Sequence, residues 1–329
     1  MKSLPQTMNT AELTEFGGPE VLTLGSRDVP QPGPDEVLIK VTTAGVNGPD
    51  LVQRRGHYPP PEGASDLLGL EVSGQVVASG TAQTLWQPGD LACALTNGGG
   101  YADYVAVNAA HCLPIPDGID QIDAAGLPET YFTVWSNVFF GQDLPENGNF
   151  LVHGGSGGIG STAIQLGAAL GLNVFTTVES DAAAEFAISL GATRTINFHE
   201  EDFVSVCREA GGADIILDII GGEYIARNIK AARHDARIIQ LAFNLGSKVE
   251  INLMPVMLKR IHYTGSTLRS RPEDFKTEVA QDLQRQVWPL FAKGTLKCVT
   301  HAVLPLAEAA KAHSMMEAGT HHGKILLQT

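Results

Sequence analysis

The sequence predicts an α/β protein in which a barrel-like β domain is joined to a doubly wound parallel sheet. In the first third of the 329 residues, short runs rich in Val, Thr and Tyr alternate with turn signals such as QPGPD and NGGG. These runs are EVLIKVTTAGV, LEVSGQVVASG and YADYVAV. From Phe150 onward, apolar runs alternate with helical patterns, as expected for a parallel sheet with helices on both faces. The first pattern predicts a β domain over residues 1–125.

The parallel sheet is predicted from five apolar runs, FLV, NVFTTV, RTINF, ADIILDII and ARIIQLAF. Helices are expected between them. In IGSTAIQLGAALG, Ile159, Ala163 and Leu166 share one helical face. The helix SDAAAEFAISLG is expected to end at Gly191, and Pro128 marks the start of an earlier helix.

The C-terminal part returns to a mixed pattern. It predicts a helix in TEVAQDLQRQVWPLFAKG, a strand in CVTHAVLPL, a short helix in LAEAAKAHSMMEAG and a final strand in GKILLQT. We expect this part to return to the β domain and complete it. Residues 1–125 and 266–329 then form one domain, and residues 126–265 form the other.

The amino-acid composition argues against some classes of binding partner. The net charge is −14 and the isoelectric point is about 5.1, so the surface repels nucleic acid and anionic membranes. The N-terminal segment has no apolar core typical of a signal peptide, and no apolar run reaches the length of about 18 residues that a membrane helix needs. The four cysteines include no CxxC pair, which favours reduced thiols and a cytoplasmic location.

The glycine-rich segment FLVHGGSGGIGSTAIQLG contains the clearest binding motif. A strand runs into a G-x-G-x-x-G turn that opens a helix, and a second strand follows. In such a turn the backbone approaches a pyrophosphate, which lies at the helix N-terminus. The expected cofactor-binding residues of this turn are Gly155, Ser156, Gly157, Gly158, Ile159 and Gly160.

An acidic residue follows the second strand. Glu179 lies about 20 residues after the turn, where an acid hydrogen-bonds the ribose hydroxyls of NAD and repels the 2′-phosphate of NADP. Ser180 is adjacent and is included in the expected cofactor site. An ordinary solvated glutamate at a strand end is the alternative interpretation. No Lys or Arg occurs between Phe175 and Leu190, and Arg194 is the first basic residue beyond them.

Several separated motifs in the same order resemble the zinc-free quinone oxidoreductases of the medium-chain dehydrogenase/reductase superfamily. They are GVNGPDLVQRRGHYPPPEGASDLLGLEVSGQV, GLPETYFTVW, LDIIGG, GSTLRSR and GKILL. GSTLRSR and the Tyr-Pro-Pro segment resemble the p53-inducible branch of this zeta-crystallin-like group. The resemblance implies a GroES-like catalytic domain, a Rossmann domain and a homodimer. The dimer would pair edge strands of the two Rossmann sheets through residues 259–268.

The resemblance also implies the absence of a zinc site. Zinc-dependent members of the superfamily carry Cys and His-Glu where this chain has Asn47 and Leu70-Glu71. An amide and an alkyl group are poor zinc ligands, and Glu71 alone cannot hold the metal. The lobe that binds structural zinc through four cysteines is also missing. We therefore expect no metal.

Without a Lewis acid, an electron-poor acceptor that takes hydride readily, such as a quinone, is the expected substrate. The stretch AGVNGPDLVQRRGHYP is interpreted as the substrate loop. Asn47 would donate its amide to a substrate carbonyl, and Tyr58 would stack on or hydrogen-bond the acceptor. A turn residue and a packed aromatic are the alternative roles of these two residues. Asp50 is expected to hold the loop.

The resemblance places further residues against the cofactor. They are Thr133, Ile219, Ile220, Leu241, Ala242, Phe243, Leu268 and Lys324. Relatives that use NADPH have a Lys after the second strand and a Tyr after the third, where this chain has an acidic stretch and Phe198. Either NADH or NADPH is possible, and these differences favour NADH.

Two other functions remain open. The same fold can reduce an enone or an enoyl thioester, and screening these against quinones would separate the two reactions. A dinucleotide-binding protein without catalytic activity is the second alternative.

Overall fold

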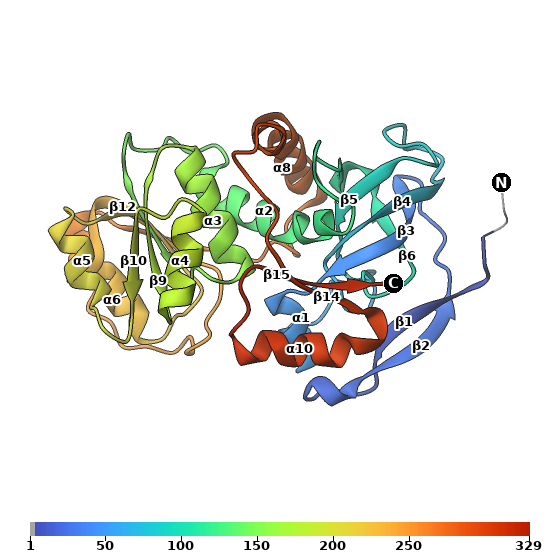
Figure 1. The fold of residues 1–329 in the computed structure, drawn as a ribbon, viewed down its shortest axis with the longest axis horizontal. Coiled ribbons are helices and arrows are strands. Elements are labelled where there is room, and N and C mark those ends of the chain that lie inside the picture. The colour runs from blue at the N-terminus through green and yellow to red at the C-terminus, as the bar shows by residue number, and fades with distance from the viewer. Residues whose placement is uncertain (1–3) are drawn as a thin grey trace. The chain divides into compact units, whose positions relative to one another are not determined.

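The computed structural model describes residues 4–329, and the chain divides into two compact units (Figure 1). Unit 1 comprises Met1–Phe132 and Arg269–Thr329, and unit 2 comprises Thr133–Leu268. The sequence placed these divisions after residues 125 and 265. Within residues 4–329, no helix combines the length and the apolar character needed to cross a membrane.

Unit 1 is built on a seven-stranded sheet. Six strands have the order β14-β15-β3-β4-β5-β7, and β6 pairs with β3. Their bounds are Glu36–Gly45 for β3, Glu71–Ser79 for β4, Leu91–Leu95 for β5, Tyr104–Asn108 for β6, Cys112–Pro114 for β7, Thr300–Pro305 for β14 and Lys324–Gln328 for β15. Strand β15 pairs antiparallel with β3, so the C-terminal strand completes the N-terminal sheet, as predicted.

The two faces of β3 pack against different parts of unit 1. Val37, Ile39 and Val41 lie in the main core of the unit, whereas Leu38 packs in a smaller cluster with Met8. This division follows from the alternation of side chains along a strand. Met8 belongs to β1 (Thr7–Leu13), which forms a separate two-stranded sheet with β2 (Leu22–Asp28).

Unit 1 also contains helices and 3-10 turns. They are α1 (Gly48–Arg54), α8 (Glu273–Gln286), α9 (Trp288–Ala292) and α10 (Ala309–Ala318), with 3-10 turns at Pro19–Val21, Ala109–His111, Asp123–Gly126 and Leu306–Glu308. The one helix predicted over TEVAQDLQRQVWPLFAKG is in fact two, because α9 starts anew with a proline in its first turn. Pro128 begins α2 (Pro128–Val134), as expected, and a π-helical turn at Trp135–Phe139 follows it.

Unit 2 contains a six-stranded sheet in which every neighbouring pair of strands is parallel. The order is β10-β9-β8-β11-β12-β13. The bounds are Asn149–His153 for β8, Asn173–Val178 for β9, Arg194–Asn197 for β10, Ala213–Asp218 for β11, Ala232–Gln240 for β12 and His262–Gly265 for β13. Counted along the chain this is 3-2-1-4-5-6, the order of a Rossmann sheet, with its switch point between β8 and β11.

Helices cover both faces of the unit 2 sheet. Figure 1 shows α3 (Gly158–Ala169) and α4 (Asp181–Ser189) on one side of the strands, and α5 (Phe203–Glu209) and α6 (Glu223–Ala231) on the other. The short helix α7 (Met254–Lys259) precedes the edge strand β13. The predicted fold class is confirmed, because a mixed β unit and a doubly wound parallel sheet are both present.

Strand β11 is shorter than the run ADIILDII suggested. It ends at Asp218, because the carboxylate of this residue accepts the backbone N–H groups of Ile220 and Gly221. Those N–H groups bond to a side chain instead of continuing the ladder. The strand therefore turns into a loop at the carboxyl edge of the sheet, where ligands bind in proteins of this topology.

Candidate active site and dinucleotide-binding turn

The glycine turn joins β8 to α3 in unit 2. A Cβ atom on Gly155 would lie 2.3 Å from Thr176 Oγ1, and one on Gly160 would lie 2.0 Å from the carbonyl oxygen of Gly154. Neither position therefore has room for a side chain. A Cβ atom on Gly157 would meet no atom within 4 Å. Close packing thus requires the first and third glycines, while the second faces open space where a ligand can approach the backbone.

The start of α3 supplies the remaining groups of the turn. Gly157 is the N-cap residue, so Gly158, Ile159 and Gly160 form the first turn of the helix. The first N–H groups of a helix have no partners within it, and the helix dipole favours an anion at this end. Ser156 precedes them. These residues and the open space at Gly157 fit a diphosphate group.

Glu179 and Ser156 lie together at the carboxyl edge of unit 2. The Ser156 hydroxyl donates to Glu179 Oε2 at 3.3 Å. Ser180 caps α4, because its hydroxyl accepts the N–H of Ala183. Its side chain is therefore engaged in the helix cap.

The residues beside Glu179 differ from those of a phosphate-binding site. The backbone N–H of Phe198 donates to the carbonyl of Val178 at 3.1 Å, so a residue without a hydroxyl adjoins Glu179. Arg194 lies in register with Phe175, well before the carboxyl end of the strand, and pairs with Glu201. The Arg194 guanidinium is therefore already engaged in an ion pair with Glu201.

Two loops expected to face the cofactor meet at the carboxyl edge of unit 2. The N–H of Leu245 donates to the carbonyl of Ile220 at 2.8 Å. A Cβ atom on Gly154 would lie 3.0 Å from Ile219 Cδ1, so this loop also borders the glycine turn. The segment that carries Leu241, Ala242 and Phe243 continues β12, and Gln240 Nε2 donates to the Ala242 carbonyl at 2.5 Å. Thr133 and Leu268 are the first and last residues of the unit.

Asn47, Glu71 and Lys324 form a buried cluster in unit 1. Lys324 Nζ lies 2.7 Å from Glu71 Oε1 and donates to Asn47 Oδ1 at 2.5 Å and to the Val46 carbonyl at 3.1 Å. The Asn47 amide donates to Glu71 Oε1 at 2.9 Å and to the Gly45 carbonyl at 3.4 Å. The ammonium and the amide thus have their hydrogens directed at groups within unit 1.

Asp50 organises the start of α1. Its Oδ2 accepts the backbone N–H of Asn47 at 2.9 Å, and its Oδ1 accepts that of Gly69 at 2.9 Å. The expectation that Asp50 holds this segment together is confirmed by these bonds. The segment after Asn47 is a helix and not a loop, because Asp50 reaches back to the N-cap residue as in a capping box. Burial raises the pKa of Asp50 to about 6, although the two N–H groups oppose the rise.

A chain of buried side chains extends from Asp50 towards α10. Arg54 has only donors, so its Nη1 donates to His313 Nδ1 at 3.1 Å. His313 Nε2 then carries the hydrogen and donates to the Tyr101 hydroxyl at 3.0 Å, and that hydroxyl donates to Asp50 Oδ2 at 3.4 Å. Arg54 also pairs with Glu317. Burial, reinforced by Arg54, lowers the pKa of His313 to about 3, so its ring stays neutral.

Tyr58 packs against a buried cation. Arg269 Cζ lies 5.6 Å from the centre of the Tyr58 ring, and the guanidinium donates to Gln53 Oε1 at 2.6 Å and to the carbonyl of Asn97. Lys276 Nζ donates to Asn97 Oδ1 at 2.9 Å. Within residues 4–329, neither cation forms an ion pair with a carboxylate, and the Tyr58 hydroxyl has no hydrogen-bond partner. Burial raises the pKa of Tyr58, so the hydroxyl remains a donor at neutral pH.

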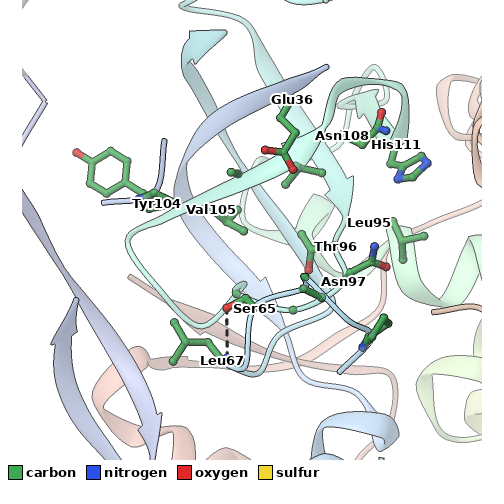
Figure 2. Close-up of a pocket in the computed structure, with 18 of the residues that line it drawn as sticks. Glu36, Ser65, Leu67, Leu95, Thr96, Asn97, Tyr104, Val105, Asn108 and His111 are labelled. Carbon is green, nitrogen blue, oxygen red and sulfur yellow. Dashed lines mark hydrogen bonds between the residues drawn. The ribbon is translucent and has the colours of Figure 1, made fainter. Parts of the chain in front are cut away.

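A cavity of about 540 Å³ in unit 1 is lined in part by Asn97, which accepts hydrogen bonds from Arg269 and Lys276 (Figure 2). Figure 2 shows Asn97, Asn108 and His111 among its lining residues, and Ser65 accepting the N–H of Leu67 at 3.2 Å. The cavity contains none of the residues expected to hold the cofactor or the acceptor. A second cavity of about 370 Å³ borders Gln53 and the two prolines after Tyr58.

Sequence patterns alone do not point to Arg269 or to the Lys324–Glu71 pair as parts of the site. Arg269 belongs to the motif GSTLRSR. It is far from Tyr58 in the sequence, and no pattern of neighbouring residues indicates that the two side chains are in contact. Asp50, three residues after Asn47, did offer a signal, since that spacing is typical of a capped helix start. Among residues 4–329, no three His, Cys, Asp or Glu side chains are grouped so that they could hold a metal ion.

Two family models match the chain. The alcohol dehydrogenase GroES-like domain matches residues 33–117, and the zinc-binding dehydrogenase family matches residues 158–285. The first match lies in unit 1, and the second lies mostly in unit 2. Both are consistent with the fold described above.

Curated relatives and solved structures match along nearly the whole chain. Quinone oxidoreductase from Mus musculus is 30% identical over 328 residues, and that from Homo sapiens is 30% identical over 329 residues, each covering 97% of both chains. Two solved structures each superpose with a TM-score of 0.88 over 98% of this chain and 100% of theirs. They are mycobacterial Rv1454c complexed with NADPH, at 26% identity, and quinone oxidoreductase from Pseudomonas syringae pv. tomato DC3000, at 25%.

The parallel sheet with its glycine turn, the two family matches and these relatives lead to one assignment, which confirms the resemblance stated from the motifs. This chain belongs to the quinone oxidoreductase branch of the medium-chain dehydrogenase/reductase superfamily.

Proposed function

We propose that this protein is an NAD(P)H-dependent quinone oxidoreductase that works without a metal. The observation that carries the proposal is the Lys324 ammonium, which bonds Asn47 and Glu71 where zinc-dependent relatives hold their metal. Because a cation already satisfies these side chains, the site has no Lewis acid to activate an alcohol. A quinone needs no such activation, and the mouse and human relatives are quinone oxidoreductases.

A nicotinamide dinucleotide fits the turn of unit 2 and, when bound, supplies the hydride. The open space at Gly157 and the N–H groups at the start of α3 receive the pyrophosphate. Ile219 borders the same turn, and Phe243 lies against the loop that carries Ile219 and Ile220, so that this loop and the segment Leu241–Phe243 position the nicotinamide half. The Rv1454c structure was solved with NADPH, which supports a dinucleotide of this class.

The acceptor is held by the Tyr58 segment of unit 1. As a quinone is reduced, negative charge develops on its oxygen, and a hydrogen-bond donor close to a fixed positive charge stabilises it. The Tyr58 hydroxyl is such a donor, and Arg269 lies against its ring. Lys276 adds a second buried cation nearby. The carboxylate of Glu129 also acts on Tyr58 and on both cations, so the two positive charges are partly balanced, and Arg269 is the cation that lies against the ring.

In this proposal Asn47 has a structural role and does not contact the acceptor directly. Both hydrogens of its amide face acceptors in unit 1, Glu71 Oε1 and the Gly45 carbonyl. The geometry favours a role in which Asn47 and Lys324 keep Glu71 in place. The expected bond from Asn47 to a substrate carbonyl stays a prediction, and a structure with a bound quinone would test it.

NADH is the preferred cofactor in this proposal. Glu179 is held beside Ser156 at the position of a ribose-binding acid, and Phe198 adjoins it without a hydroxyl. Arg194 is paired with Glu201 and cannot serve a 2′-phosphate without breaking that pair. The kcat/KM values for NADH and NADPH with one simple quinone test the preference. Glu179→Gln should lower the value for NADH by about 10- to 100-fold, as expected for loss of a charged hydrogen bond.

A turnover screen tests the reaction itself. Purified protein is given NADH or NADPH with a quinone, an enone or an enoyl thioester, and oxidation of the cofactor is followed by absorbance. Turnover that is fastest with the quinone is expected. Preference for the enone or thioester would replace the proposal with the alternative reductase. Binding of the dinucleotide without oxidation by any acceptor would favour a non-catalytic role.

We propose a homodimer through the edge of the unit 2 sheet. Within residues 4–329, strand β13 pairs only with β12, and its residues are exposed. Met257 and Leu258 of the neighbouring α7 are 66% and 61% exposed, which is typical of a surface that another chain covers. Sedimentation should give a dimer for the wild type and a monomer for Leu258→Asp. Ile188→Asp, an exposed apolar position on α4, is the matched control and should remain dimeric.

We propose a cytoplasmic location for the protein. All four cysteines are unpaired in the structure, and three of them are buried. Free buried thiols are usual in a reducing compartment. Fractionation of cells that produce the tagged protein would test the location.

A further inference from the structure

A buried polar chain crosses the switch point of the unit 2 sheet. His153, the last residue of β8, is 1% exposed, and both of its ring nitrogens have partners. Nδ1 lies 3.1 Å from Thr177 Oγ1 on β9, and Nε2 lies 2.8 Å from Asn228 Oδ1 on α6. Asn228 Nδ2 in turn donates to Asp218 Oδ2 on β11 at 2.9 Å. At the other end, the N–H of Gly154 donates to Thr177 Oγ1 at 3.2 Å.

The Asp218 end of this hydrogen-bond chain determines which atom donates in each of its bonds. The Asp218 carboxylate can only accept, so Asn228 directs its NH2 group at Asp218 and its carbonyl oxygen at His153 Nε2, which therefore carries a hydrogen. In the neutral ring Nδ1 then carries none and accepts from the Thr177 hydroxyl, whose oxygen accepts the N–H of Gly154. Burial lowers the pKa of His153, which agrees with a neutral ring. The chain is therefore complete, with one tautomer and one amide orientation.

Both ends of this hydrogen-bond chain adjoin the segments that hold the cofactor in the proposed function. Gly154 directly precedes the glycine turn. Asp218 Oδ1 accepts the N–H groups of Ile220 at 2.6 Å and Gly221 at 3.0 Å, which fixes the loop after β11. In a sheet of this order, the dinucleotide binds at the carboxyl ends of the strands on either side of the switch point. β8 and β11 are those two strands.

We propose that Thr177, His153 and Asn228 are positioning residues that hold the glycine turn and the Ile219–Gly222 loop in the arrangement that binds the dinucleotide. The inference rests on the proposed function, because it concerns the same cofactor. His153 packs edge-on against the stacked rings of Phe203 and Tyr224, with ring centres 4.7 and 4.9 Å away, where an apolar residue would satisfy packing alone. A polar network in such surroundings is rigid when every member is satisfied.

The test measures dinucleotide affinity directly, by NADH fluorescence, in the absence of any acceptor. Thr177→Val removes the hydroxyl at nearly constant shape, and Asn228→Leu removes the link to Asp218. Each should raise the Kd for NADH by about tenfold, and the double variant should be little worse than either single variant because the chain acts as a unit. Thr177→Ser should restore the affinity. The KM for the quinone at saturating NADH should stay within twofold of the wild type.

Thr96→Val is the matched control. Its hydroxyl is also buried but lies in unit 1, where it donates to the Gly69 carbonyl at 2.7 Å. This variant should lose comparable stability and keep the wild-type Kd. If Thr177→Val and Asn228→Leu fold as the wild type does and keep its Kd, or if Thr96→Val weakens binding as much as they do, the inference is overturned. A wild-type protein that binds neither NADH nor NADPH would overturn the proposed function as well.

Discussion

Lys324 and Glu71 form a buried ion pair, with Nζ 2.7 Å from Oε1 and side-chain exposures of 9% and 0%. Glu71 opens β4 and Lys324 opens β15, on either side of β3. The carboxylate also accepts the Asn47 amide and, through Oε2, the backbone N–H of Glu129 at 2.8 Å. A buried charge requires this kind of compensation, because desolvation of an isolated carboxylate is very unfavourable.

Lys324→Met should destabilise the protein strongly. The substitution leaves Glu71 buried without its cation, and loss of one partner of a buried pair typically lowers the free energy of unfolding by about 3–5 kcal/mol. Urea unfolding followed by circular dichroism measures the change. The double variant Lys324→Met/Glu71→Gln should lose less than Lys324→Met alone, because it buries no unpaired charge. A double variant as unstable as the sum of the two single variants would contradict this account of the pair.

Purified protein should contain no stoichiometric zinc, and a chelator should leave its quinone turnover unchanged. The physical reason is the donor set: Asn47 offers an amide, Leu70 offers no donor, and the ammonium of Lys324 repels a second cation beside Glu71. Elemental analysis of protein that has been dialysed against metal-free buffer checks the first part. About one zinc per chain, or activity lost to the chelator and recovered with zinc, would show that the site binds metal despite this arrangement.

Asp50 should make folding stability depend on pH between about 4 and 6. Burial raises its pKa from 3.8 to about 6 in the folded state. The neutral carboxyl is therefore favoured by folding, and this contribution, on the order of 3 kcal/mol, is present at low pH and lost as the pH rises through about 6. The measurement is the free energy of unfolding of the wild type and of Asp50→Asn at several pH values.

The Asp50→Asn variant separates this effect from the titration of other groups. Asparagine cannot accept both N–H groups that Asp50 accepts, so the variant should be less stable by a constant amount, and its amide does not ionise. The stability difference between wild type and variant should shrink as the pH rises from 4 to 6. A difference that stays constant over this range would show that the Asp50 pKa is near its ordinary value.

Most of the fold followed from local patterns in the sequence. The alternation of apolar runs and helical segments predicted the parallel sheet, since period and order are properties of neighbouring residues. The glycine turn was identified for the same reason, because Gly155, Gly157 and Gly160 lie within six positions. The ends of individual helices and strands were harder to predict. Strand β11 stops at Asp218 because the carboxylate of this residue accepts backbone N–H groups, and the spacing of residues alone does not reveal such a bond.

The site was predicted only in part, because its key contacts join distant parts of the chain. Lys324 was assigned to the cofactor from its motif, and nothing in the sequence near it pointed to Glu71. His153 lies next to the glycine turn in sequence, but its role cannot be inferred there, since its partners lie on β9 and α6. Contacts of this kind depend on strand order, which the folded structure supplies.

Arg269→Gln should lower quinone turnover by more than it alters cofactor affinity. The substitution removes the positive charge beside Tyr58, so the reduced acceptor loses electrostatic stabilisation, and a fall in kcat/KM for the quinone of about 10- to 100-fold is expected. Arg269→Lys keeps the charge and should recover part of the loss. Arg271→Gln is the matched control, because Arg271 is exposed and stacks only on Phe275. Steady-state kinetics with varied quinone and with varied NADH measure the two effects. Equal losses in Arg269→Gln and Arg271→Gln, or a change confined to the KM for NADH, would remove Arg269 from the acceptor site.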